Sequence, residues 1–195
     1  MCVCSAYNLA MKLSYPANLG GSSDSNYLRQ IWKKVWSLPI PYKACHFGWR
    51  AWREAFFAKT NLLRRKVIQE DTYEICKEAS ETAGHVLWSC LKAQEAWECS
   101  KLAMNSNRTK GISFQDLMWQ LMMIEGIRDD QATRVVTIAW ALWHNRNELR
   151  NGDVRKSGQV LVKWAMDYLA EYGAVIESDE LLSLVVEQTV SWSPP

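Results

Sequence analysis

The 195-residue sequence lacks long apolar runs, regularly spaced cysteines and any strong alternation of polar and apolar residues. No segment approaches the roughly 18–20 apolar residues that span a bilayer, so we expect no membrane partner. Residues 1–16 do not combine a basic start with a long apolar stretch, so we expect no secretory signal. The six cysteines follow no disulfide framework, which favours a reducing, intracellular location.

Patterns that carry catalysis are also missing. The sequence has no Gly-rich phosphate loop, no nucleophile elbow and no carboxylate pair suited to acid–base chemistry. His144 has no nearby acid or nucleophile that suggests a triad, and Arg146 is expected to pair with an acid on a neighbouring helical turn. The sequence therefore predicts a protein that is not an enzyme.

Helical periodicity runs through most of the chain, whereas the alternation typical of strands is weak throughout. The pattern predicts a mainly α fold: an irregular helical domain with a small zinc-knuckle-like turn around residues 70–90, followed by a C-terminal helical segment. Ser113 is expected to cap one helix, and Asp129 or Asp130 to start another. The expected helices cover residues 5–13, 26–38, 44–59, 60–67, 85–104, 114–123, 129–150 and 154–173.

Positive charge is concentrated in one segment, although the net charge of the chain is only +2. Residues 28–66 carry ten lysines and arginines against the single acid Glu54, together with eight aromatic residues. Such a segment suits a polyanion, because cations neutralise phosphates and exposed aromatic rings stack on unpaired bases. The candidate nucleic-acid-binding residues are Lys33, Lys34, Arg50, Arg53, Arg64 and Arg65.

A packing role offers an alternative explanation of the same segment. Its tryptophans have helical spacing, so they can form a helix–helix core whose charged neighbours are simply a solvated face. These tryptophans are Trp32, Trp36, Trp49 and Trp52. On this interpretation the chain is a tryptophan-rich helical protein-interaction or scaffold fragment with no retained activity.

A candidate metal site lies in DTYEICKEASETAGHVLWSC, residues 71–90, where Cys76, His85 and Cys90 are spaced like three corners of a zinc site. A structural zinc ion takes four ligands, but the residue three positions before Cys76 is Tyr73, whose phenol is a poor ligand. Cys99 would lie about 13–14 Å from Cys90 along one helix, too far to share a metal. Two interpretations stay open: a zinc site, or a vestigial knuckle with buried thiols.

Six motifs follow one another in a family-like order. They are SAYNLA (5–10), WKKVWSLPIPYKACHFGWRAW (32–52), FFAKTNLLRRKV (56–67), YEICKEASETAGHVLWSCLKAQEAW (73–97), WALWHNRN (140–147) and the final SWSPP. In this order they resemble the zinc-binding region that follows the reverse transcriptase domain in plant LINE-type (non-LTR) retrotransposons.

The resemblance implies a zinc cofactor held by a CxxC pair, a histidine and a further cysteine. Carried over to this sequence, the ligands are Cys76, His85 and Cys90, and the first cysteine of the family pattern is replaced by Tyr73. The expected organisation is an N-terminal helix and loop (1–27), a zinc-binding-like domain (28–104), a helical linker region (105–190) and a tail (191–195).

The resemblance also implies where such a module works. In a full-length element it would sit between the reverse transcriptase and RNase H domains, with the catalytic carboxylates of both enzymes outside this chain. We therefore predict a retrotransposon-derived, non-catalytic module that binds RNA or DNA inside the cell, with the nucleus as a candidate location.

Overall fold

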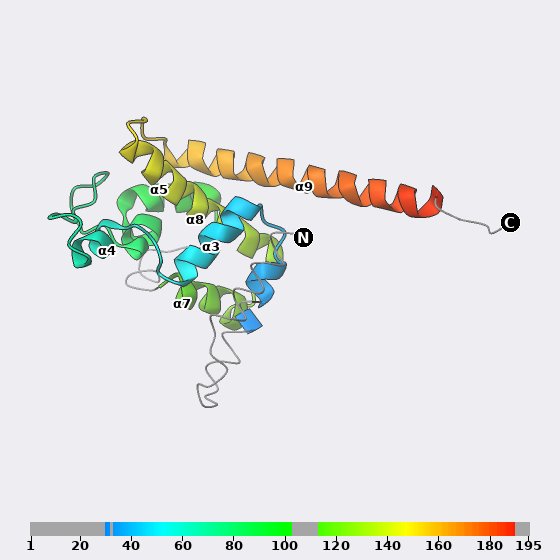
Figure 1. Ribbon diagram of the computed structural model, residues 1–195, viewed down its shortest axis with the longest axis horizontal. Helices are drawn as coiled ribbons and strands as arrows, with labels where there is room; N and C mark the ends of the chain where they lie inside the picture. The colour runs from blue at the N-terminus through cyan, green and yellow to red at the C-terminus, as the bar shows by residue number, and fades with distance from the viewer. Residues whose placement is uncertain (1–29, 32, 103–112, 190–195) are drawn as a thin grey trace, which may run out of the picture.

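The computed structural model describes residues 30, 31, 33–102 and 113–189 (Figure 1). The predicted helix at 5–13, Trp32, the tail at 191–195 and the boundary between 104 and 105 lie outside these residues. In the described part the fold is mainly α, as predicted, and the one pairing of extended segments is an isolated bridge between Thr72 and Ser80. None of the helices there is both long and apolar enough to cross a membrane.

The long helix α8, Asp129–Arg150, forms the centre of the fold. It begins where the sequence predicts, with Asp129 and Asp130 in a first turn where acids interact favourably with the helix dipole. It ends just before Gly152, whose φ of 97° is readily adopted only by glycine. Nearly all residues from 132 to 146 are buried, so other elements cover α8 on several sides.

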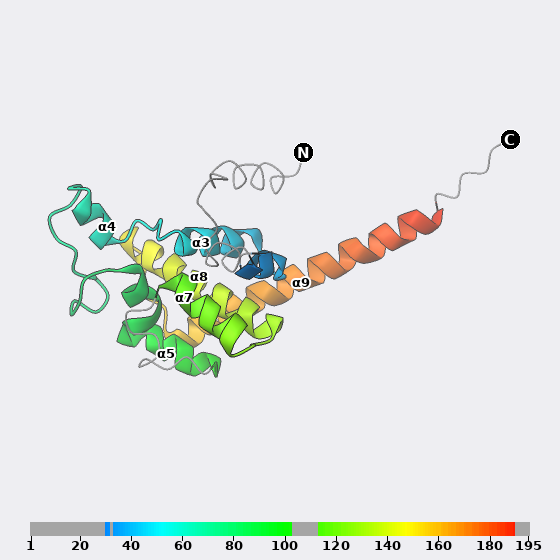
Figure 2. The ribbon, with the colours of Figure 1, turned by 90° about the horizontal axis from the view of Figure 1, so that it is seen from below.

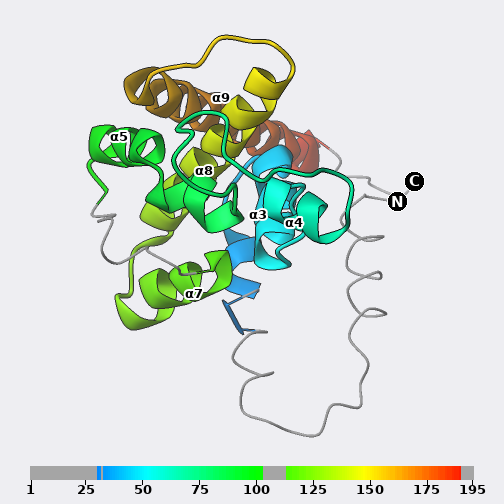
Figure 3. The same ribbon diagram turned by 90° about the vertical axis from the view of Figure 1, so that its left-hand side faces the viewer.

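The helix α3, Tyr42–Trp52, packs on α8, whereas α5, Leu91–Ser100, lies on the other side of α8 and packs mainly on α9, Gly158–Thr189 (Figures 2 and 3). The π-helical turn η1, His85–Ser89, leads into α5 and also contacts α8. The large indoles of Trp88 and Trp97 are fully buried and stack on each other, with ring centroids 5.2 Å apart. This stack holds η1, which begins at His85, against α5, whose N-cap is Cys90.

A further helical pair, α7 (Phe114–Trp119) and η2 (Gln120–Ile124), continues the core after residues 103–112. As predicted, Ser113 caps α7, and its hydroxyl accepts a hydrogen bond from the Asp116 N–H. Because α7 packs against α3, elements on both sides of residues 103–112 contribute to one hydrophobic core.

The helix predicted at residues 44–59 ends earlier than expected, and this prediction was wrong. α3 stops at Trp52, because the chain reverses through Glu54, which has a φ of 48°. The N–H groups of Glu54 and Ala55 bond back to the carbonyls of Ala51 and Arg50, a pattern that closes helix ends. The short helix α4, Lys59–Arg64, follows after this reversal.

The helix predicted to end near Gly173 is much longer, so this prediction was also wrong. α9 runs from Gly158 to Thr189 and extends away from the other helices (Figure 1). Gly173 weakens a helix by only about 1 kcal/mol relative to alanine, and no proline lies between Gly173 and Thr189 to stop it. The first turns of α9 pack on α5 and α8, where Trp164 stacks on Trp140 at 5.0 Å.

The predicted tryptophan core is present only in part among the described residues. Trp52 is buried in the core, whereas Trp36 and Trp49 are only half-buried. Packing therefore explains most, but not all, of the aromatic side chains in the basic segment.

Candidate metal centre and basic surface

A tight loop between Thr72 and Ser80 forms one half of the candidate metal centre. The Tyr73 N–H donates to the Ala79 carbonyl at 2.8 Å, and the Lys77 N–H donates to the Tyr73 carbonyl at 2.8 Å. Lys77 has a φ of 58°, which turns the chain sharply directly after Cys76. The loop therefore carries Tyr73 and Cys76 on the same turn.

The other half comes from η1 and the start of α5. The Thr82 hydroxyl accepts the His85 N–H at 2.9 Å, so Thr82 caps the helical turn that carries the histidine. Cys90 has an extended backbone and is the N-cap residue of α5, and its N–H donates to the His85 carbonyl at 2.9 Å. The Thr82 cap and the hydrogen bond between Cys90 and His85 thus orient His85 and Cys90 toward the loop.

The three predicted ligands converge. The ligand atoms of Cys76, His85 and Cys90 all lie within 4.8 Å of one another, and the Cys76 Sγ is 3.2 Å from the His85 Nε2. Tyr73 lies beside them, with its ring edge-on to the imidazole of His85 at 5.5 Å between centroids. Only 3% of Tyr73 is exposed, so its side chain closes the inner side of the cluster.

The protonation of these groups is set mainly by burial. Burial raises the pKa of the Cys90 thiol, while the N–H groups of Lys92 and Ala93 at the start of α5 partly oppose this. Burial also lowers the pKa of His85, which favours the neutral imidazole that a metal needs. The pKa of Tyr73 is raised strongly by the same cause, so its phenol stays protonated.

Zinc fits this donor set. Two thiols and one imidazole are ligand types that zinc prefers, and Cys76, His85 and Cys90 form the one such cluster in the described part of the chain. The protonated phenol of Tyr73 does not provide a fourth ligand of this kind. Cys99 is exposed near the far end of α5, as expected, and Cys45 lies half-buried on α3. The other two thiols, Cys2 and Cys4, are outside the residues described.

Residues 4–97 match the family model described as zinc-binding in reverse transcriptase. The match contains all three converging side chains and supports a reverse transcriptase zinc-binding domain in this part of the chain. No curated protein and no solved structure matches the chain.

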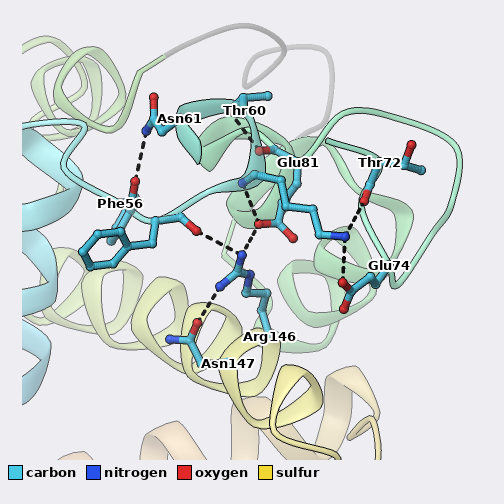
Figure 4. Close-up of polar contacts among 10 residues, drawn as sticks. Phe56, Thr60, Asn61, Thr72, Glu74, Glu81, Arg146 and Asn147 are labelled. Carbon is cyan, nitrogen blue, oxygen red and sulfur yellow. Dashed lines mark hydrogen bonds and ion pairs between the residues drawn. The ribbon is translucent and has the colours of Figure 1, made fainter. Parts of the chain in front are cut away.

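The region that matches this family model is joined to α8 by a buried ion pair (Figure 4). The Glu81 carboxylate accepts from the Arg146 guanidinium, and the side chains of both are at most 3% exposed. Glu81 also accepts the Lys59 N–H at 3.0 Å, and Arg146 donates to the Phe57 carbonyl at 3.1 Å. The pair therefore connects three segments: the chain before α4, the turn before η1, and α8.

The contacts of Arg146 and His144 correct two sequence-based expectations. Arg146 does not pair with an acid on a neighbouring turn, because its side chain points inward to Glu81, 65 residues away in sequence. His144 does have an acid close by, since its Nδ1 lies 3.4 Å from Glu148 on the next turn. His144 also packs against Trp140 and Trp164, as expected of a histidine on a packed helix.

A lysine links α4 to the loop of the metal cluster. The Lys59 Nζ donates to the Thr72 carbonyl at 3.1 Å and pairs with the Glu74 carboxylate at 2.7 Å (Figure 4). This pairing lowers the pKa of Glu74, chiefly through its hydrogen bond to Lys59. Lys59 is thus held by two partners of the fold.

The six predicted nucleic-acid contacts fall into two groups. Lys33 and Lys34 lie in the helical segment that precedes α3, and Lys34 is 4.0 Å from Asp129. The other four lie in the last turn of α3 or α4 or directly after it; they are Arg50, Arg53, Arg64 and Arg65. Arg53, Arg64 and Arg65 are exposed, whereas Arg50 is half-buried and reaches over the Phe57 ring at 5.0 Å.

Sequence reasoning missed Glu81 as a structural centre. Glu81 and Arg146 both belong to motifs quoted for the family resemblance, ET before the histidine and RN after the last tryptophan. Their presence in two motifs of the family resemblance could have indicated that both residues matter. It could not have predicted that they contact each other, because 65 residues separate them in sequence.

Proposed function

We propose that this chain is a non-catalytic module derived from a reverse transcriptase, stabilised by zinc and able to bind RNA or DNA. The observation that carries the proposal is the convergence of Cys76, His85 and Cys90 within a region that matches the reverse transcriptase zinc-binding family. The order of the motifs supports an origin in a plant LINE-type element, where the module would lie between the reverse transcriptase and RNase H domains and act in the nucleus.

Zinc would supply a cross-link between segments that the backbone alone joins weakly. Cys76 would hold it from the 72–80 loop, His85 from η1, and Cys90 from the start of α5. In this chain Tyr73 replaces the first cysteine of the family pattern, so three protein ligands remain and water can complete the set. We expect weaker binding than at a four-ligand structural site, because zinc affinity depends on the full set of ligands.

Nucleic-acid binding is supported by the excess of positive charge on elements next to the metal cluster. Residues 42–66, from the start of α3 to just past the end of α4, contain seven lysines and arginines against Glu54 alone. Exposed arginines of this group are available to phosphates, because the fold uses few of them for ion pairs. Counterion release would then give binding that weakens steeply with salt.

Metal analysis of matched cysteine variants tests the zinc part of the proposal. Cys90→Ser removes a converging ligand, whereas Cys99→Ser removes an exposed thiol on the same helix. We expect zinc to co-purify with the unchanged chain and with Cys99→Ser, and to be lost from Cys90→Ser. Equal zinc content in the two variants would contradict the assignment of the ligands.

Binding of a labelled RNA or DNA oligonucleotide at low salt tests the other part. The proposal predicts binding that falls as salt increases. A complete lack of binding at low salt would contradict the nucleic-acid function and favour a protein-interaction fragment.

A further inference from the structure

We propose that the outward face of α3, together with Phe57, is a binding site for single-stranded nucleic acid. Unpaired bases stack on Tyr42 and Phe57, and the neighbouring cations hold the phosphates. The inference rests on the proposed nucleic-acid function and adds to it a surface and a class of strand.

The two faces of α3 differ sharply in composition. One face, which includes Ala44, Phe47 and Ala51, is buried against α7 and α8. The opposite face consists of Tyr42, Lys43, His46, Arg50 and Arg53, spaced so that they share one side of the helix. No Asp or Glu occurs in the eleven residues of α3.

The most exposed aromatic rings of the described residues both belong to this surface. Tyr42 and Phe57 are each 55% exposed, while every other described Phe, Tyr or Trp is buried or half-buried. The imidazole of His46 stacks on Tyr42 with centroids 6.3 Å apart, which extends the flat surface along the helix. Aromatic rings exposed to this extent suit stacking on bases.

The backbone at Phe57 is held in place by the core of the fold. The Phe57 carbonyl accepts a hydrogen bond from Arg146, and the adjacent Phe56 is buried with its ring stacked on Trp143 at 4.2 Å. From above, the guanidinium of Arg50 lies 5.0 Å from the Phe57 ring centroid. A residue whose backbone is already fixed loses less freedom when a base stacks on its side chain, which favours binding.

The charge around these rings identifies a polyanion as the ligand. Lys43 and Arg53 are exposed on the same face, and Arg50 lies between them, whereas Glu54 at the helix end is the one acid near this face in the sequence. The distance from Tyr42 to Arg53 along the helix is about 16 Å, enough for four to five nucleotides at about 3.4 Å each. Since base faces are hidden in a duplex, rings on a helix surface favour a single strand.

Fluorescence anisotropy with two probes tests the inference: a labelled single-stranded DNA of about twelve nucleotides, and the duplex with its complement. The unchanged chain is expected to bind the single strand more tightly than the duplex at equal salt. The double variant Tyr42→Ala with Phe57→Ala is expected to lose at least about tenfold in single-strand affinity, with little change for the duplex.

Two controls separate stacking from folding and from general charge. Tyr42→Phe retains a ring and is expected to bind like the unchanged chain. Lys92→Gln with Lys101→Gln alters exposed cations around α5, on the far side of α8 from α3, and is expected to have a small effect (Figure 2). Circular dichroism verifies that each variant is folded.

The outcomes distinguish this inference from the function on which it rests. If the unchanged chain binds the single strand and the double alanine variant binds it equally well, the α3 surface is wrong while the nucleic-acid function survives. If the unchanged chain binds neither probe at low salt, both are wrong.

Discussion

The carboxylate of Glu81 and the guanidinium of Arg146 form an ion pair that is almost completely removed from solvent, although 65 residues separate them in sequence. Glu81 directly precedes Thr82, the cap of the turn that carries His85. Arg146 belongs to the central helix α8. The pair therefore anchors the turn that carries His85 to the core of the fold.

Removing one partner of this pair is expected to destabilise the protein strongly. Arg146→Ala leaves the Glu81 charge buried without its partner, and such changes cost about 3–5 kcal/mol. Urea denaturation followed by circular dichroism measures this loss in the free energy of unfolding.

The matched control is Lys163→Ala, which removes an exposed pair with Asp167 one turn away on α9. An exposed pair of this kind contributes about 0.3–0.5 kcal/mol. Similar losses in the two variants would mean that the buried pair does not anchor the fold.

Two glycines of α9 are expected to respond in opposite ways to alanine. A Cβ on Gly173 meets no atom within 4 Å, so Gly173→Ala should stabilise the helix by about 0.5–1 kcal/mol. A Cβ on Gly158 would lie 2.7 Å from the backbone of Glu95 and Ala96, so Gly158→Ala should destabilise by about 1–3 kcal/mol. Urea denaturation of both variants checks the prediction, and a destabilised Gly173→Ala would contradict a continuous α9.

The stability of the zinc-free protein is expected to fall as the pH drops below about 7. Burial holds the pKa of His85 below its unfolded value of 6.5, so the unfolded chain binds the proton more readily. This contribution is fully present above pH 6.5 and is lost as the pH falls toward the lower folded pKa.

The measurement compares urea midpoints of chelator-treated protein at about pH 7.5 and about pH 5.5. His85→Gln should show a smaller decrease than the unchanged chain, because glutamine does not titrate. An equal decrease in both proteins would assign the pH dependence to other groups.

Arg64 and Arg65 are expected to contribute to nucleic-acid binding through charge alone. Both are exposed near the end of α4, and the Arg64 guanidinium donates to the Asn61 side chain on the same helix. Arg64→Ala with Arg65→Ala should reduce the slope of log affinity against log salt by about 1.4 for a single strand. A slope equal to that of the unchanged chain would remove both residues from the interface.

The sequence predicted well those features that depend on local chemistry. The Ser113 cap, the start of α8 at Asp129 and the convergence expected of Cys76, His85 and Cys90 follow from capping, charge and ligand spacing. These features depend on residues that are close in sequence or that belong to a recognisable pattern.

The wrong predictions concern the ends of two helices and the partner of Arg146, which depend on tertiary contacts. α3 ends at Trp52 because Glu54 adopts a positive φ, which places Phe56 in the core against Trp143. α9 continues through Gly173 because one glycine costs less than the helix gains. Arg146 points inward because its partner Glu81 lies 65 residues away in sequence, and the helical periodicity of the sequence cannot predict such a partner.

The affinity of the chain for zinc, compared between the unchanged protein and Tyr73→Cys by competition with a chelator, tests the metal centre most directly. The account predicts that a cysteine on the 72–80 loop adds the missing thiolate, so that the variant binds zinc at least about tenfold more tightly and approaches one zinc per chain. Equal affinity in the two proteins, or no zinc in either, would contradict it.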